Sequence, residues 1–236
     1  MARLVLVHGS VTNGQMTWSA QQALADRWEL VVLDRPGFPP GPPVERVDFA
    51  EHAEWLTGQL RPDDHLCGHS YGGVVSLLAA ARVEALRSLT VIEPPATAVA
   101  RGNPAADAFA AGAIELWRDG PRDPDAFLRL FLRVVGSSFE PPTPLPPALE
   151  QGARTLMVER GPWEAEIPLA ELRAAPFPKL VVSGAHHPAF DAICDALEDG
   201  LGAERAVLPG AGHSAQRAPG FNERLASFLQ RAEQAK

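Results

Sequence analysis

Short apolar runs alternate with stretches of helical spacing along most of this 236-residue chain. Each run is rich in valine, leucine or isoleucine without regular polar positions, which is typical of strands buried on both faces of a parallel sheet. The six runs lie at residues 4–7, 30–33, 65–67, 89–92, 180–182 and 205–208. Helical patterns lie at residues 49–60, 71–81, 193–201 and 221–232. The alternation predicts an α/β fold with a doubly wound, mostly parallel six-stranded sheet.

The alternation is interrupted from about residue 96 to residue 176, between the fourth and fifth runs. Three further helices are expected there, at 105–117, 124–135 and 147–159, and a proline-rich extended segment separates the last two. We interpret residues 1–236 as a single domain with this insertion as a helical cap. Such a cap would cover the carboxyl ends of the strands, where open α/β sheets place their sites. The alternative is an insertion without a functional role.

Composition narrows the cellular context and the class of partner. The net charge of −8 argues against nucleic acid or an anionic membrane surface as partner. Residues 74–81 form the longest apolar stretch, which is too short to span a bilayer, and the apolar segment before His8 is too short for a signal peptide. Cys67 and Cys194 are too few for a disulfide framework. We expect a cytoplasmic, bacterial protein that acts on a small molecule; its oligomeric state stays open.

The segment GHSYGG at residues 68–73 follows the third run and opens a helix. It fits the G-x-S-x-G nucleophile elbow, in which a sharp strand-to-helix turn exposes a serine. Glycines are needed two positions to either side, because larger side chains would collide with the neighbouring backbone. This pattern predicts that Ser70 is a nucleophile, and the alternative is a purely structural turn.

The first run ends in His8-Gly9-Ser10, which would lie beside the elbow in a parallel sheet. The backbone amides of Ser10 and Tyr71 are therefore candidates for an oxyanion hole, in which each donor is worth about 3 kcal/mol in the transition state. We expect His8 to stabilise the turn rather than to act as a base.

A histidine follows the last run. His213 is flanked by glycines on a loop at the strand ends, so it can reach Ser70 and accept its proton. The alternative is an exposed loop histidine. We expect His52, His65 and His69 to be surface or packing residues.

Together these segments resemble the α/β-hydrolase fold superfamily, and the chain looks like a serine hydrolase or esterase-like member. The matching landmarks are LVLVHG at 4–9, DRPGF at 34–38, GHSYGG at 68–73, VIEPP at 91–95, LVVSG at 180–184 and GH at 212–213. The resemblance implies a serine, an acid and a histidine that work without a cofactor or a metal. It also implies that the two strands that usually precede the first run are missing, as in some small esterases and hydroxynitrile lyases.

The sequence departs from this family at the acid. Most members place it just after the strand that here ends at residue 184, but residues 185–188 read AHHP. Glu93 ends the neighbouring strand, where a minority of relatives place the acid. Asp191 lies slightly further along the expected loop, and Asp195 lies one helical turn beyond it. We favour Glu93, with Asp191 or no acid as alternatives.

The predicted function is hydrolysis of a small to medium apolar carboxylic ester, thioester or lactone through an acyl-enzyme. Apolar residues of the insertion are candidates to line the pocket: Phe109, Ile114, Trp117, Phe127, Leu130, Phe131, Phe139 and Trp163. Asp34 and Arg35 are expected to brace a loop. Because the usual acid is missing, the alternative is a non-hydrolytic protein on the same scaffold, either a ligand-binding module or a hydroxynitrile-lyase-like lyase.

Overall fold

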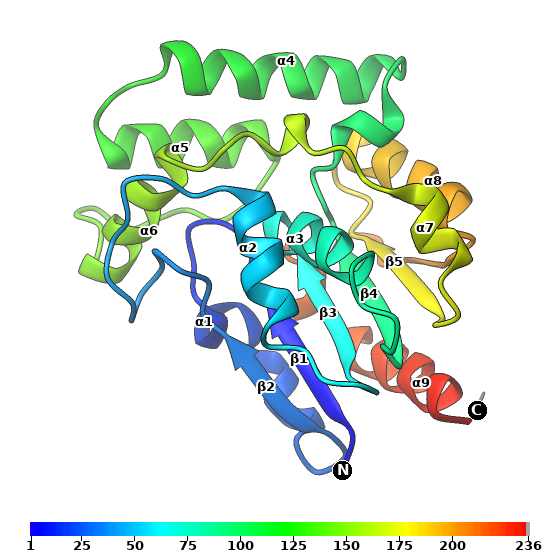
Figure 1. The fold of residues 1–236 in the computed structure, drawn as a ribbon. Coiled ribbons are helices and arrows are strands. Elements are labelled where there is room, and N and C mark those ends of the chain that lie inside the picture. The colour runs from blue at the N-terminus through cyan, green and yellow to red at the C-terminus, as the bar shows by residue number, and fades with distance from the viewer. Residues whose placement is uncertain (235–236) are drawn as a thin grey trace.

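A computed structural model describes residues 1–234 and confirms the six-stranded, doubly wound sheet (Figure 1). The strands are β1 (Arg3–Val7), β2 (Glu29–Leu33), β3 (His65–His69), β4 (Ser88–Ile92), β5 (Lys179–Ser183) and β6 (Glu204–Val207). They are arranged in the order β2-β1-β3-β4-β5-β6, and every neighbouring pair is parallel. All six carboxyl ends therefore lie along one edge of the sheet.

Helices cover both faces of the sheet because alternate residues of each strand point to opposite sides. Val5 and Val7 of β1 belong to the core on the face covered by α2 (Phe49–Thr57), α3 (Tyr71–Ala80) and α8 (Pro188–Leu201). Leu4 and Leu6 belong to the core on the other face. That face is covered by α1 (Gly14–Trp18), the 3₁₀ helix η1 (Ser19–Leu24) and α9 (Phe221–Gln234). The strands are thus buried on both faces, as their apolar runs predict.

Local capping explains where two of the helices begin. Asp48 accepts hydrogen bonds from the amides of Ala50 and Glu51, which fixes the start of α2. The ring nitrogen Nδ1 of His187 accepts a hydrogen bond from the amide of Ala189, and Pro188 occupies the first position of α8. Helix α8 therefore begins five residues before the predicted stretch 193–201.

The segment between β4 and β5 contains η2 (Thr97–Ala100), α4 (Pro104–Asp119), α5 (Pro124–Val134), α6 (Pro147–Met157), η3 (Pro162–Glu164) and α7 (Leu169–Ala174). Helices α4 to α6 lie close to the predicted bounds and are placed beyond the carboxyl ends of the strands (Figure 1). Helix α7 was not predicted; it packs beside α8 at the flank of the sheet. None of the helices within residues 1–234 combines the length and the apolar character needed to cross a membrane.

Candidate active site

Ser70 lies in the sharp turn between β3 and α3, with φ of 53° and ψ of −127°. This left-handed conformation is strained for a residue with a side chain. A Cβ at Gly68 would overlap the Ser76 hydroxyl, and a Cβ at Gly72 would overlap the carbonyl oxygen of His8. The amide of Ser70 donates to the carbonyl of Ile92 over 2.8 Å, which holds the turn against β4. The glycines are therefore required by close packing around a fixed serine.

His213 meets Ser70 from the loop after β6. Its Nε2 lies 3.0 Å from Ser70 Oγ, within hydrogen-bonding reach. The Nε2 of His69 donates to the carbonyl oxygen of His213 over 2.9 Å, and the ring of Phe190 packs 4.8 Å from the His213 ring. The structure thus brings the two candidate residues together and holds the histidine loop by its backbone.

Glu93 follows directly on β4 and is completely buried. Its Oε2 lies 3.5 Å from Nδ1 of His213, and its Oε1 accepts from the amide of Gly184 over 2.5 Å. Burial raises the pKa of the Glu93 carboxyl, but the side chains of His186 and His213 and the Gly184 amide lower it more, to about 2. The carboxylate is therefore ionised beside the histidine.

The other candidate acids have different partners. Asp191 accepts a hydrogen bond from the Ser183 hydroxyl over 3.0 Å and lies 4.0 Å from the Arg205 guanidinium. Asp195 pairs with the same guanidinium at 3.2 Å. Of the three carboxylates considered from the sequence, Glu93 is the one that the structure places at His213.

His186 is a neighbour of Glu93 that the sequence analysis missed as a site residue. Its Nδ1 lies 3.5 Å from the same Oε2 atom that faces His213, and its Nε2 donates to the carbonyl oxygen of Val135 over 3.0 Å. Burial lowers the pKa of His186, but the adjacent Glu93 carboxylate raises it more, so the net shift is upward. The sequence feature that could have identified His186 is its position in the loop after β5, where most members of the resembling family carry the triad acid.

The candidate oxyanion loop lies against the elbow. A Cβ at Gly9 would lie 2.8 Å from the Cβ of Ser70, so glycine permits this contact. Ser10 and Tyr71 line the same cavity as Ser70. Tyr71 is the first residue of α3, so its amide has no intrahelical acceptor and lies at the positive end of the helix dipole.

A buried ion pair braces the candidate oxyanion loop. The Ser10 hydroxyl donates to Glu159 Oε2 over 2.5 Å, and the Arg35 guanidinium donates to Glu159 Oε1 over 2.8 Å. Arg35 also donates to the carbonyl oxygens of His8 and Gly9. Burial raises the pKa of Glu159, and Arg35 and Ser10 offset part of that shift. The predicted bracing role of Arg35 agrees with these contacts; no sequence pattern pointed to Glu159, which follows α6.

The remaining histidines of the core are used in packing. His8 Nδ1 donates to the Gly9 carbonyl over 2.7 Å, and its Nε2 accepts from the Arg35 amide over 2.9 Å, so both ring nitrogens are occupied. His52 accepts from Arg35, and His65 hydrogen-bonds to Ser88. Burial lowers the pKa of His8, His52 and His65, which matches a neutral structural role.

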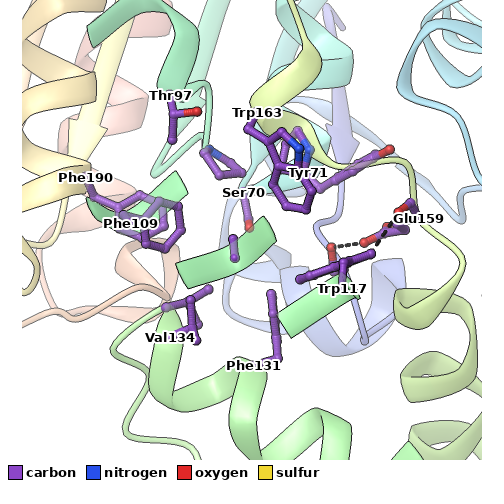
Figure 2. A pocket seen from close by; sticks show the side chains of 15 residues that line it. Ser70, Tyr71, Thr97, Phe109, Trp117, Phe131, Val134, Glu159, Trp163 and Phe190 are labelled. Carbon is purple, nitrogen blue, oxygen red and sulfur yellow. Dashed lines mark hydrogen bonds between the residues drawn. The ribbon is translucent and has the colours of Figure 1, made fainter. Parts of the chain in front are cut away.

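Two cavities meet at Ser70. The first is a small, partly open chamber in which apolar side chains from α4, α5 and α8 surround the serine (Figure 2). Four of the predicted cap residues line it: Phe109, Trp117, Phe131 and Trp163. The second is a wider and more polar cleft, lined in part by His213, Arg217 and Phe139. The serine hydroxyl therefore lies where an apolar chamber opens to a wider cleft.

The other predicted pocket residues take different positions. Phe127 and Leu130 pack in a separate core between α5 and α6, and Ile114 is exposed on α4.

Comparison with models of known protein families gives a match over most of the chain. A model of the family described as "Alpha/beta hydrolase family" matches residues 4–222. Two curated relatives are pimeloyl-[acyl-carrier protein] methyl ester esterases. The one from Aeromonas hydrophila is 37% identical over 92 residues, and the one from Aeromonas salmonicida is 38% identical over 94 residues. Each match covers 38% of this chain and 36% of the relative, so the chain aligns with little more than a third of their length.

Solved structures share the architecture at low sequence identity. MenH from S. aureus superposes with a TM-score of 0.73 and 16% identity, covering 98% of this chain and 94% of that one. A thermophilic esterase from Thermogutta terrifontis gives a TM-score of 0.67 and 21% identity, covering 98% and 90%. At these identities the likeness shows the fold alone.

Proposed function

Because the chain belongs to the alpha/beta hydrolase family, we propose that it is a serine hydrolase that cleaves small to medium apolar carboxylic esters, thioesters or lactones. The observation that carries this proposal is the 3.0 Å contact between Ser70 Oγ and His213 Nε2, at the junction of the two cavities. A nucleophile within hydrogen-bonding reach of a base that is itself oriented by an acid is the arrangement that acyl transfer needs.

In the proposed reaction, Ser70 Oγ attacks the acyl carbonyl carbon while His213 Nε2 accepts the hydroxyl proton. The amides of Ser10 and Tyr71 donate to the oxygen that becomes negative, and each is worth about 3 kcal/mol to the transition state. The tetrahedral intermediate expels the leaving group, which takes the proton from His213. Water then attacks the acyl-enzyme with His213 again as the base, and the carboxylic acid and free Ser70 result.

Glu93 is the proposed acid of this triad. A carboxylate 3.5 Å from Nδ1 favours the tautomer with the proton on that nitrogen, which leaves Nε2 free to accept from Ser70. It also stabilises the imidazolium that forms during each half-reaction. Since Glu93 carries this charge in a fully buried position, the stabilisation is little weakened by solvent.

The apolar chamber beside Ser70 supports an apolar substrate group. Its walls include Phe109, Phe131 and Phe190, and the helices between residues 96 and 176 supply most of them (Figure 2). We propose that these helices act as a cap within a single domain. The partial relatives are named as esterases of an acyl methyl ester, and this activity is compatible with an apolar acyl group bound beside Ser70.

Labelling with a fluorophosphonate tests the proposal, with intact mass as the readout. The wild-type protein should gain one adduct, the Ser70→Ala variant should gain none, and the wild type should hydrolyse p-nitrophenyl esters. Absence of Ser70-dependent labelling would favour a ligand-binding module. Labelling without ester turnover would favour a lyase, which is the second class considered from the sequence.

A further inference from the structure

Three buried atoms converge beside the proposed nucleophile without good hydrogen bonds to any described residue. They are Oε2 of Glu93, Nδ1 of His186 and Nδ1 of His213. All three lie within 4.8 Å of one another, and each nitrogen is 3.5 Å from the carboxylate oxygen. A buried carboxylate oxygen and two imidazole nitrogens that share one small space form a set of potential ligands for a cation.

The tautomer of His186 strengthens this interpretation. The carbonyl oxygen of Val135 can only accept, so the Nε2 of His186 carries the proton of the 3.0 Å hydrogen bond. In the neutral ring, Nδ1 then directs a lone pair at the Glu93 carboxylate, and two acceptors face each other. This arrangement is stabilised when a positive charge lies between them, either a proton or a metal ion.

We propose that Glu93, His186 and His213 form a Zn²⁺ site. Two imidazoles and one glutamate are a known ligand set for zinc, with the fourth position held by water or substrate. Tetrahedral zinc with bonds of about 2.0 to 2.1 Å separates its ligand atoms by about 3.3 Å, close to the observed nitrogen-to-oxygen distances of 3.5 Å. The Val135 carbonyl acts as the second-shell acceptor that orients a zinc-bound histidine.

Zinc at this site would inhibit the enzyme, and this consequence rests on the proposed function. Coordination through Nδ1 of His213 moves the ring proton to Nε2, the atom that must accept the Ser70 proton. It also engages the Glu93 carboxylate as a metal ligand, so that this carboxylate no longer orients the His213 ring. Zn²⁺ is therefore a reversible inhibitor, because His213 and Glu93 cannot bind the metal and serve in the triad at the same time.

Direct binding tests the site without relying on activity. Tag-free Ser70→Ala protein, which keeps all three ligands, is dialysed against Zn²⁺ alone. We expect one ion per chain and a metal-dependent rise in the melting temperature. Adding His186→Asn to this protein should weaken zinc affinity by about 100-fold or more, since even loss of a second-shell partner costs about 10- to 100-fold.

The adjacent histidine provides a matched control. His187→Asn removes an imidazole one position away, while asparagine can keep the cap of α8. It should bind zinc as the parent does. His186→Gln is the second variant, used if His186→Asn does not unfold cooperatively. Zinc binding that survives both His186 variants, or that His187→Asn abolishes equally, would overturn the proposal.

Inhibition is measured in the wild type and in each His186 variant, relative to that variant's own metal-free ester turnover. Zn²⁺ should inhibit the wild type, EDTA should restore it, and Mg²⁺ should have little effect because it prefers oxygen ligands. Equal inhibition by Mg²⁺, or by Zn²⁺ in the His186 variants, would count against the site. Stoichiometric zinc binding without inhibition would instead keep the site and contradict the proposed role of His213.

Discussion

Glu93 reaches His213 from the end of β4, with 3.5 Å between Oε2 and Nδ1, while the loop after β5 contributes the Gly184 amide that holds the other carboxylate oxygen. The carboxylate and the loop thus occupy the same region, although most relatives would supply the acid from the loop itself. Strands β4 and β5 are neighbours in the sheet, so their carboxyl ends can each present a group to the same histidine.

Replacing Glu93 with Gln should lower ester turnover by up to about 10⁴-fold, because in the proposed triad an amide does not stabilise the required tautomer of His213 or its imidazolium. Asp191→Asn is the matched control: that carboxylate binds Ser183 and Arg205, so its loss should leave turnover nearly unchanged. Steady-state kcat on a p-nitrophenyl ester measures both variants. Equal kcat for Glu93→Gln and the parent would contradict Glu93 as the acid.

Replacing Glu159 with Gln should lower the free energy of unfolding by about 3 to 5 kcal/mol, because it leaves the Arg35 guanidinium buried without its counter-charge. Glu164→Gln is the control, since its ion pair with Arg160 is roughly half exposed and should contribute less than about 1 kcal/mol. Urea unfolding followed by circular dichroism measures both changes. Similar losses of unfolding free energy in the two variants would contradict the bracing role of the buried Arg35–Glu159 pair.

Gly152→Ala should lower both stability and ester turnover. A Cβ at Gly152 would overlap the carbonyl oxygen of Val11, the residue that follows Ser10, so α6 or the loop that carries Ser10 must move. Such overpacking costs about 1 to 3 kcal/mol. Gly112 lies in α4 with open space around its Cβ position, so Gly112→Ala should stabilise the protein by about 0.5 to 1 kcal/mol. Melting temperatures and kcat of the two variants provide the comparison. Unchanged turnover in Gly152→Ala would contradict the dependence of activity on the packing of α6 against the loop that carries Ser10.

His52 should make the folded protein sensitive to acid. Burial, followed by the positive charge of Arg35, lowers its pKa from 6.5 to about 3, and Asp48 opposes this shift. As the pH falls below 6.5, the unfolded chain binds a proton at His52 and the folded chain does not, so stability decreases until the pH reaches about 3. Within that window the group contributes a slope of about 1.4 kcal/mol per pH unit.

The His52→Gln variant tests this contribution, because glutamine can accept from Arg35 but does not titrate. Urea unfolding at several pH values between about 4 and 6 should give a shallower dependence for the variant than for the wild type. Parallel curves would mean that His52 does not account for the loss of stability in acid.

The local sequence determined the sheet, the elbow and much of the helical insertion. Runs without polar alternation specify strands buried on both faces, and the glycines around Ser70 specify a turn that few other sequences can form. Asp48 and the prolines at the starts of α4, α5, α6 and α8 likewise mark helix starts by local rules. These features depend on residues close together in the chain, so a single sequence is enough to find them.

Tertiary structure decided which side chains complete the site. Glu93 and Asp191 both follow predicted strands, and only folding showed that one faces His213 while the other faces Arg205. The pairing of Ser10 with Glu159 joins residues 149 positions apart, and no local pattern encodes it. The convergence of His186 on Glu93 likewise depends on the direction in which neighbouring strand ends present their side chains. Such contacts are set by packing between distant segments, whereas periodicity and turn chemistry act only between neighbours in the chain.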